Sequence, residues 1–175
     1  SAYFRPGSPK YTQQNQSYGL TTIRKKHLNI EGDEMVFSYK GKSGKFQEKH
    51  IINSKLSKVI SELEELPGYR LFKYYDENGE LITVESQDLN QYIKEIMGEE
   101  FSAKDFRTWA GTMIAAGILD ELGICEKRQQ KEMKKRIRNA IVAVSEKLGN
   151  TPSVARDSYI DPRIFEHYKN GQTIN

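Results

Sequence analysis

The sequence predicts an α+β domain that is mainly α-helical and contains one small three-stranded antiparallel sheet. Two observations support this class. Residues 27–52 alternate apolar and polar side chains between turn residues, and most of the chain from residue 56 onward carries apolar residues at helical spacing. With 175 residues, of which 37% are hydrophobic, the chain is long enough for one domain with a real core. We therefore expect a single catalytic or binding domain over residues 1–175.

The first half of the chain contains the predicted sheet. Pro6, Gly7 and Pro9 interrupt residues 1–23, so we expect short helical pieces joined by turns there. The stretches HLNI, MVFSYK and KFQEKHII then alternate with period two, and the turn-rich residues 31–33 and 41–44 separate them. This pattern predicts a three-stranded meander.

Helical spacing begins after the sheet. One helix is predicted from the apolar series Leu56, Val59, Ile60, Leu63 and Leu66, and Pro67-Gly68 ends it. Residues 71–86 predict a short irregular or extended segment, and residues 88–98 a helix that ends on Gly98.

Three further predictions concern the second half of the chain. A helix capped by Ser102 and Asp105 should run to about Glu121, and its predicted buried stripe is Phe106, Trp109, Ala110, Met113, Ile114 and Ile118. A long helix should begin near Glu126 and end at Gly149, with its core side formed by Met133, Ile137, Ala140, Ile141, Val144 and Leu148. Thr151 and Pro152 should start the next helix, and Pro162 the last one.

Several classes of chemistry are disfavoured by the sequence. The chain has one cysteine, Cys125, and no apolar run near eighteen residues, so we expect no internal disulfide, no membrane span and a reducing compartment. The histidines are scattered and no metal-ligand motif occurs, so we expect no metal and no cofactor. GKSGK at 41–45 lacks the P-loop glycine, because Val36 stands in its place, and a hairpin turn is the better interpretation.

Basic residues are unevenly distributed, although the net charge is only +3. RKKH stands at 24–27, and the run that starts at Lys127 holds seven basic residues and one acid. Each run alone fits a solvated face better than a binding site. Lys104 and Arg107 share one face at the start of a predicted helix, which favours a phosphate there; a structural salt bridge to Asp105 or Asp120 would explain Arg107 about as well.

Five ordered blocks suggest a family. They are FRPGSPKY with QSYGLTTIRKKH, FSYKGKSG, LPGYRLFKY, FSAKDFRTWAGT and LGNTPSVARDSYIDP. Together they resemble the catalytic domain of the poxvirus and bacterial type IB DNA topoisomerases, from Arg5 to about Tyr168. The resemblance implies the fold shared by these enzymes and the tyrosine recombinases. It also implies that the β-rich amino-terminal lobe of the family is absent from this chain.

The resemblance assigns roles by position. It implies that Arg5 and Arg107 are the catalytic arginines, Lys42 the hairpin lysine, Asn150 the fourth electrostatic residue and Tyr159 the nucleophile. Poxviral members carry histidine at the Asn150 position, whereas bacterial members resemble this chain in having asparagine. Lys104 matches a family lysine that reaches the DNA beside the cleaved phosphate. Lys10 and Tyr11 match positions that resemble DNA contacts of the family.

The implied reaction is transient cleavage of one strand of duplex DNA through a 3′-phosphotyrosyl link, strand swivelling and religation. It relaxes supercoils without ATP or metal. Under this interpretation the partner is duplex DNA, the protein is a monomer, and its location is cytoplasmic: the bacterial nucleoid, or the virion or host cytoplasm of a large DNA virus. A tyrosine recombinase is the alternative enzyme, but it typically carries HxxR and LGH where this chain has KDFR and LGN. A non-catalytic DNA-binding domain is the alternative from another class.

Overall fold

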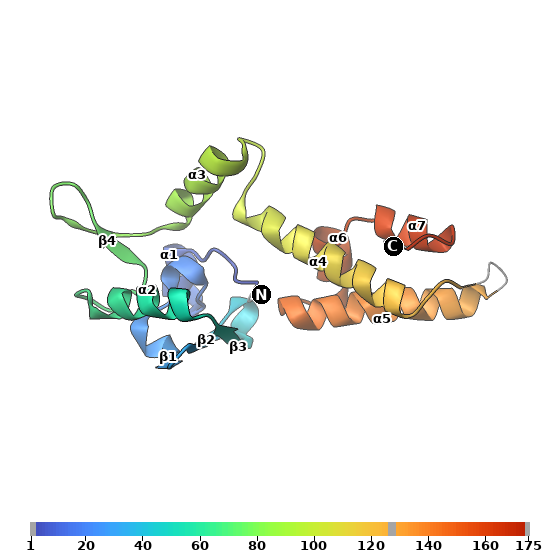
Figure 1. The fold of residues 1–175 in the computed structure, drawn as a ribbon, viewed down its shortest axis with the longest axis horizontal. Coiled ribbons are helices and arrows are strands. Elements are labelled where there is room, and N and C mark those ends of the chain that lie inside the picture. Colours follow the sequence, from blue (N-terminus) through green and yellow to red (C-terminus); the bar gives the residue numbers. More distant parts are fainter. Residues whose placement is uncertain (1–2, 126–128, 174–175) are drawn as a thin grey trace. The chain divides into compact units, whose positions relative to one another are not determined.

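The computed structural model describes residues 3–125 and 129–173. The chain divides into two compact units, Ser1–Ala103 and Lys104–Asn175, which we describe separately. Figure 1 colours the first unit blue to green and the second yellow to red. The predicted class, mainly helical with a three-stranded antiparallel sheet, is confirmed. The expectation of one domain over residues 1–175 stays a prediction.

Unit 1 contains two sheets and three α-helices within its described residues. The α-helices are α1 (Pro9–Asn15), α2 (Ser54–Glu65) and α3 (Ser86–Met97). The strands are β1 (Leu28–Glu31), β2 (Glu34–Lys40), β3 (Phe46–Ile52), β4 (Lys73–Tyr75) and β5 (Leu81–Thr83). β1, β2 and β3 form the predicted meander, and β4 pairs with β5 in the segment that was expected to be irregular or extended.

The core of unit 1 forms on one face of β2. Met35, Phe37 and Tyr39 are buried at alternate positions, as the period-two pattern predicts. The Phe4 ring lies edge-on to Phe37, with centroids 5.2 Å apart, and stacks on Tyr39 at 6.0 Å. Because Phe4 is held by the sheet, the position of Arg5 is tied to the core of the unit.

The helix α2 ends at a cluster of backbone carbonyls. The Lys73 ammonium group is buried and donates hydrogen bonds to the carbonyls of Leu66, Pro67 and Gly68. These acceptors lie just past the last turn of α2, where helix carbonyls lack intrahelical partners. Burial, with a smaller contribution from the Lys25 charge, lowers the pKa of Lys73. LPGYRLFKY is therefore a structural motif that joins α2 to β4.

Unit 2 is helical in its described residues. It consists of α4 (Ala103–Glu121), α5 (Gln130–Leu148), α6 (Pro152–Tyr159) and α7 (Arg163–Lys169). The predicted start of α5 near Glu126 lies outside the described residues. Along α5, Met133, Ala140, Ile141, Val144 and Leu148 are buried as expected. No described helix is long and apolar enough to cross a membrane.

The buried face of α4 differs from the prediction. The large residues Phe106, Trp109 and Met113 are 49%, 69% and 45% exposed, so their assignment to the core was wrong. Ala110 is buried as predicted, and the helix buries it within a face of mostly small residues that also contains Arg107, Gly111, Ala115, Ala116 and Leu119. Small side chains allow close approach of backbones, and α4 uses this face against the chain around Tyr159.

The pKa values of two histidines in unit 1 are shifted in opposite directions. His50 on β3 lies 2.8 Å from a Glu34 oxygen and 3.1 Å from a Glu48 oxygen, and these hydrogen bonds raise its pKa above 6.5. Burial, followed by the Lys26 and Arg24 charges, lowers the pKa of His27. We predict that an NMR pH titration gives a higher midpoint for His50 than for His27.

The direction of the pKa shift also determines how His50 contributes to stability at each pH. Because its folded pKa is raised, its contribution is present below the unfolded pKa and disappears as pH rises through the folded value. The variant Glu34→Gln should lower the His50 midpoint and leave that of His27 unchanged. A His27 midpoint above that of His50 in the unmodified protein would contradict the described geometry.

Candidate active site

Tyr159 ends the short helix α6 and is half-buried against Arg107 of α4. The guanidinium carbon of Arg107 lies 4.9 Å from the centre of the Tyr159 ring. Arg107 is 3% exposed, and its Nη2 donates to the Leu148 carbonyl at 2.8 Å. A cation over an aromatic face contributes about 0.5–2 kcal/mol, depending on desolvation. The pair therefore fixes the Tyr159 ring beside a buried positive charge.

The backbone around Tyr159 rests on one face of α4. A Cβ atom placed on Gly111 would lie 2.2 Å from the Tyr159 carbonyl oxygen, so only glycine permits this approach. One turn earlier the Thr108 hydroxyl lies 3.4 Å from the Ser158 carbonyl, and Thr112 Oγ1 accepts a hydrogen bond from the Asp161 amide at 2.9 Å. The segment RTWAGT thus forms a platform for residues 158–161.

Asn150 stands in the turn between α5 and α6. Gly149 adopts a left-handed conformation with φ 64°, and the Asn150 amide donates to the Ser145 carbonyl at 2.8 Å, which closes α5. The Thr151 hydroxyl then accepts from the Val154 amide at 3.3 Å and caps α6. Both predicted helix-end features are confirmed, and they hold the half-buried Asn150 two residues after the carbonyl bound by Arg107.

In unit 1, Arg5 belongs to an extended segment that is hydrogen-bonded to residues 20 and 21. The Leu20 amide donates to the Arg5 carbonyl at 2.7 Å. Two residues earlier in the chain, the Tyr18 amide donates to the Lys40 carbonyl at 2.7 Å. The contact requires glycine at residue 19, because a Cβ atom there would lie 2.6 Å from the Gly7 Cα. Residues 18–20 therefore link Arg5 to the end of β2.

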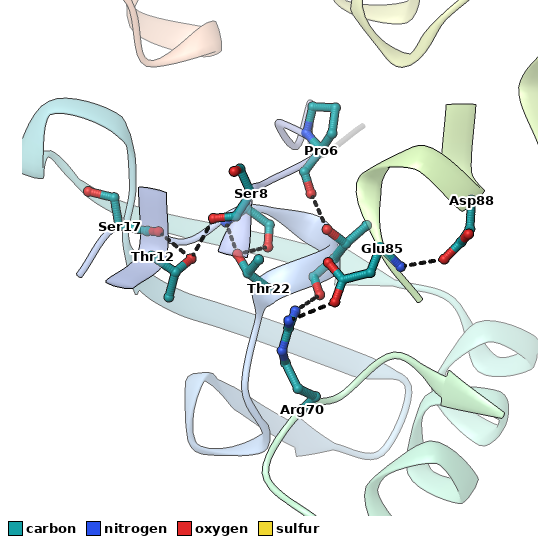
Figure 2. Close-up of polar contacts among 10 residues, drawn as sticks. Pro6, Ser8, Thr12, Ser17, Thr22, Arg70, Glu85 and Asp88 are labelled. Carbon is teal, nitrogen blue, oxygen red and sulfur yellow. Dashed lines mark hydrogen bonds and ion pairs between the residues drawn. The ribbon is translucent and has the colours of Figure 1, made fainter. Parts of the chain in front are cut away.

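Polar side chains reinforce the same frame, as Figure 2 shows. The Thr12 hydroxyl lies within hydrogen-bond distance of the Ser8 and Ser17 carbonyls, at 3.1 and 2.9 Å. Farther along the chain, Arg70 Nη2 contacts Glu85 Oε1 at 2.9 Å, and the Glu85 amide donates to Asp88. The Thr21 hydroxyl donates to the Pro6 carbonyl at 3.0 Å, and Arg70 Nη1 donates to the Thr21 carbonyl at 2.6 Å, so hydrogen bonds connect the segment that carries Arg5 to Arg70.

Lys42 lies at the tip of the hairpin between β2 and β3. Its side chain is exposed, and Ser43 beside it has φ 60°. A cavity of about 360 Å³ lies between this turn and α1, and both Lys42 and Tyr11 line it. Lys10 is exposed on the same helix as Tyr11. The GKSG segment joins two strands, as the hairpin interpretation requires.

The structure thus brings the predicted residues together in two groups. In unit 2, Arg107 contacts Tyr159 and is bonded to the segment that leads to Asn150, whereas Lys104, one turn before Arg107, is exposed. In unit 1, a shared frame holds Arg5 and the hairpin of Lys42. The positioning roles of Thr108, Gly111 and Thr112 were missed by sequence reasoning, although a run of small residues inside a helix was a visible signal.

We predict that Gly111→Ala destabilises the protein by about 1–3 kcal/mol, because the new methyl group would displace the Tyr159 backbone. The measurement is urea unfolding. Gly117→Ala on the same helix is the matched control, since a Cβ atom there meets nothing within 4 Å. The control should gain about 0.5–1 kcal/mol in helix propensity. Equal stability of the two variants would contradict the close approach at Gly111.

Comparison with known proteins identifies the family. The family model for eukaryotic DNA topoisomerase I, catalytic core, matches residues 1–173. The chain is 36% identical to DNA topoisomerase 1B of Acanthamoeba polyphaga mimivirus, over 95% of this chain and 51% of the viral protein. It is 26% identical to DNA topoisomerase I of Monkeypox virus and to DNA topoisomerase 1B of Vaccinia virus (strain Copenhagen), over 95% of this chain and 50% of each relative.

The chain spans about half the length of the curated relatives it matches. These matches do not favour the tyrosine recombinase alternative. The family expected from the sequence blocks is confirmed, and the chain belongs to the type IB DNA topoisomerase family, over its catalytic core.

Proposed function

We propose that this chain performs the strand cleavage and religation of a type IB DNA topoisomerase, with Tyr159 as the nucleophile. The observation that carries the proposal is the contact between the Tyr159 ring and the buried Arg107 guanidinium, 4.9 Å apart. A neutral phenol is a weak nucleophile, and a fixed guanidinium beside it is positioned to stabilise the negative charge that develops as the phenol oxygen attacks the phosphate. Attack on a backbone phosphate would form a 3′-phosphotyrosyl bond.

The transition state carries added negative charge on the non-bridging phosphate oxygens. Planar guanidinium groups match two such oxygens with paired hydrogen bonds, which is the role we assign to Arg107 and Arg5. The Asn150 side chain supplies a neutral N–H donor for the same charge. Arg107 and Asn150 are held by α4 and by the closed end of α5, and such preorganised donors need little rearrangement during the reaction.

Lys42 is assigned the proton transfer to the departing 5′-oxygen. An alkoxide is a poor leaving group, and a positioned general acid contributes about 10² to 10⁴ in rate. Lys42 is exposed at a hairpin tip, which gives its ammonium group access to a bound strand. Religation reverses each step, because the phosphotyrosyl bond retains the energy of the phosphodiester. No ATP and no metal enter this scheme.

The remaining assignments concern DNA binding and context. Lys104, Lys10 and Tyr11 are proposed to contact the DNA backbone and bases near the cleaved phosphate; all three are exposed. We propose residues 1–175 as one catalytic domain, acting as a monomer in the cytoplasm on duplex DNA.

The first test replaces the nucleophile. We predict that Tyr159→Phe abolishes formation of the covalent protein–DNA complex on a suicide duplex, in EDTA and without ATP. Phenylalanine keeps the ring that packs on Arg107, so duplex binding and thermal stability should change little. Tyr168→Phe is not a suitable control, because its hydroxyl donates to the Gly123 carbonyl. The exposed Tyr92→Phe serves instead and should cleave normally. Full cleavage by the Tyr159 variant would disprove the assignment.

The second test isolates the general acid. We predict that Lys42→Ala slows cleavage by about 10² to 10⁴-fold on ordinary DNA. A substrate with sulfur at the 5′-bridging position should restore the rate to within about tenfold, because a thiolate leaves without a proton. The measurement is single-turnover cleavage of both substrates. An equal deficit on the sulfur substrate would show that Lys42 acts elsewhere, and Lys45→Ala in the same turn region is the control.

A further inference from the structure

A groove lies between α5 and α6 in unit 2, apart from the candidate active site. Its volume is about 700 Å³, and neither Arg107, Asn150 nor Tyr159 lines it. The basic residues along it are Lys134 and Arg138 of α5, Arg156 of α6 and Lys169 at the end of α7. The helices α5 and α6 pack on each other, so the groove is a feature of one compact unit.

The groove has a strong excess of positive charge. Among its described lining residues four are cationic, and the one acid is Asp157, which accepts a hydrogen bond from the Ser153 hydroxyl at 3.1 Å. Within residues 3–125 and 129–173, none of the four cationic side chains forms an ion pair. Concentrating like charges costs free energy that a bound anion would offset.

The basic run on α5 also contains Arg136, which has a structural role instead of lining the groove. Arg136 Nη1 donates to the Leu122 and Gly123 carbonyls at 2.6 and 3.0 Å, and its Nε contacts Glu132 at 3.2 Å. Arg136 is thus a structural residue that ties α5 to the end of α4. Lys134 and Arg138 have no such hydrogen bonds among the described residues. Among its described residues, the run therefore contributes Arg136 to a structural contact and Lys134 and Arg138 to the groove.

The shape of the groove favours an extended polyanion over a single small anion. A second cavity of about 380 Å³ shares Lys134, Ile137 and Lys169 with it and continues along α5 to Gln130. From Gln130 to Ile141 the helix rises about 17 Å, at 1.5 Å per residue. That length corresponds to about five nucleotides of a strand at 3.4 Å each. Ile137 and Ile141 give the track an apolar floor, suited to sugar faces between phosphates.

We propose that this groove binds the phosphate backbone of a nucleic acid as a second contact surface, separate from the cleavage site. The choice of nucleic acid over an acidic protein segment rests on the proposed function, in which DNA is the substrate. Lys134 and Arg138 lie one helical turn apart and contact phosphates of the same strand, while Arg156 and Lys169 approach from the facing elements.

The test compares two double variants of α5 that remove the same charge. Lys134→Gln/Arg138→Gln changes the groove, and Lys131→Gln/Lys135→Gln changes exposed lysines that do not line it. Anisotropy of a fluorescent 40-base-pair duplex is measured between 50 and 200 mM salt. We expect the groove variant to bind about tenfold more weakly at 150 mM and its salt slope to fall by about 2, one for each lost phosphate contact. The control should change less than twofold.

Two results would overturn the proposal. One is equal affinity and equal salt slope for the two double variants, with folding of both verified by thermal melting. The other is a groove variant that loses binding of labelled polyglutamate but keeps binding of the duplex, which would assign the groove to an acidic protein segment. Covalent cleavage by the unmodified protein is measured in parallel. Absence of cleavage together with the expected binding difference would reject the proposed function while supporting the groove.

Discussion

The close approach of Tyr159 to α4 is the constraint on which unit 2 depends. The carbonyl of Tyr159 lies where a side chain at residue 111 would stand, and hydrogen bonds from the neighbouring residues fix the chain on both sides of it. Because Arg107 projects from the same helix one turn earlier, the ring of Tyr159 and the guanidinium are set by one rigid element. A small change in the packing of α4 would move the proposed nucleophile and its positive partner together.

Burial of the Arg107 guanidinium costs desolvation free energy, and hydrogen bonding to the surrounding chain offsets part of it. An arginine that is 3% exposed needs acceptors, and the last residue of α5 provides one through its carbonyl. The left-handed Gly149 then ends α5, so that the turn with Asn150 follows directly. The four residues 148–151 therefore have three roles. They end α5, they accept a hydrogen bond from the buried Arg107, and they place Asn150, a proposed phosphate-binding residue. A charge held in this way favours an anionic ligand more than an exposed charge would.

Local patterns predicted most of the fold, because those patterns report local physics. The alternation of Met35, Phe37 and Tyr39 reflects a strand with one buried face, and Gly149 with Thr151 reflects the backbone needs of helix ends. The prediction failed where packing between distant segments decides burial. Phe106 and Trp109 are more hydrophobic than Gly111, yet α4 buries the glycine, because close contact with Tyr159 requires a small face. In the site, family resemblance supplied the chemical residues. The run of small residues in α4 was visible in the sequence, but only the fold shows that this run contacts the chain around Tyr159.

The identity of the residue that becomes linked to DNA tests the central claim most directly. The chain has ten tyrosines, and trypsin cleavage after Arg156 and Arg163 isolates Tyr159 in the peptide DSYIDPR. After trapping on a suicide duplex and nuclease digestion, mass spectrometry of the tryptic peptides locates the remaining nucleotide. Our account predicts that the nucleotide is found on DSYIDPR. A nucleotide on any other peptide, with DSYIDPR unmodified, would contradict it.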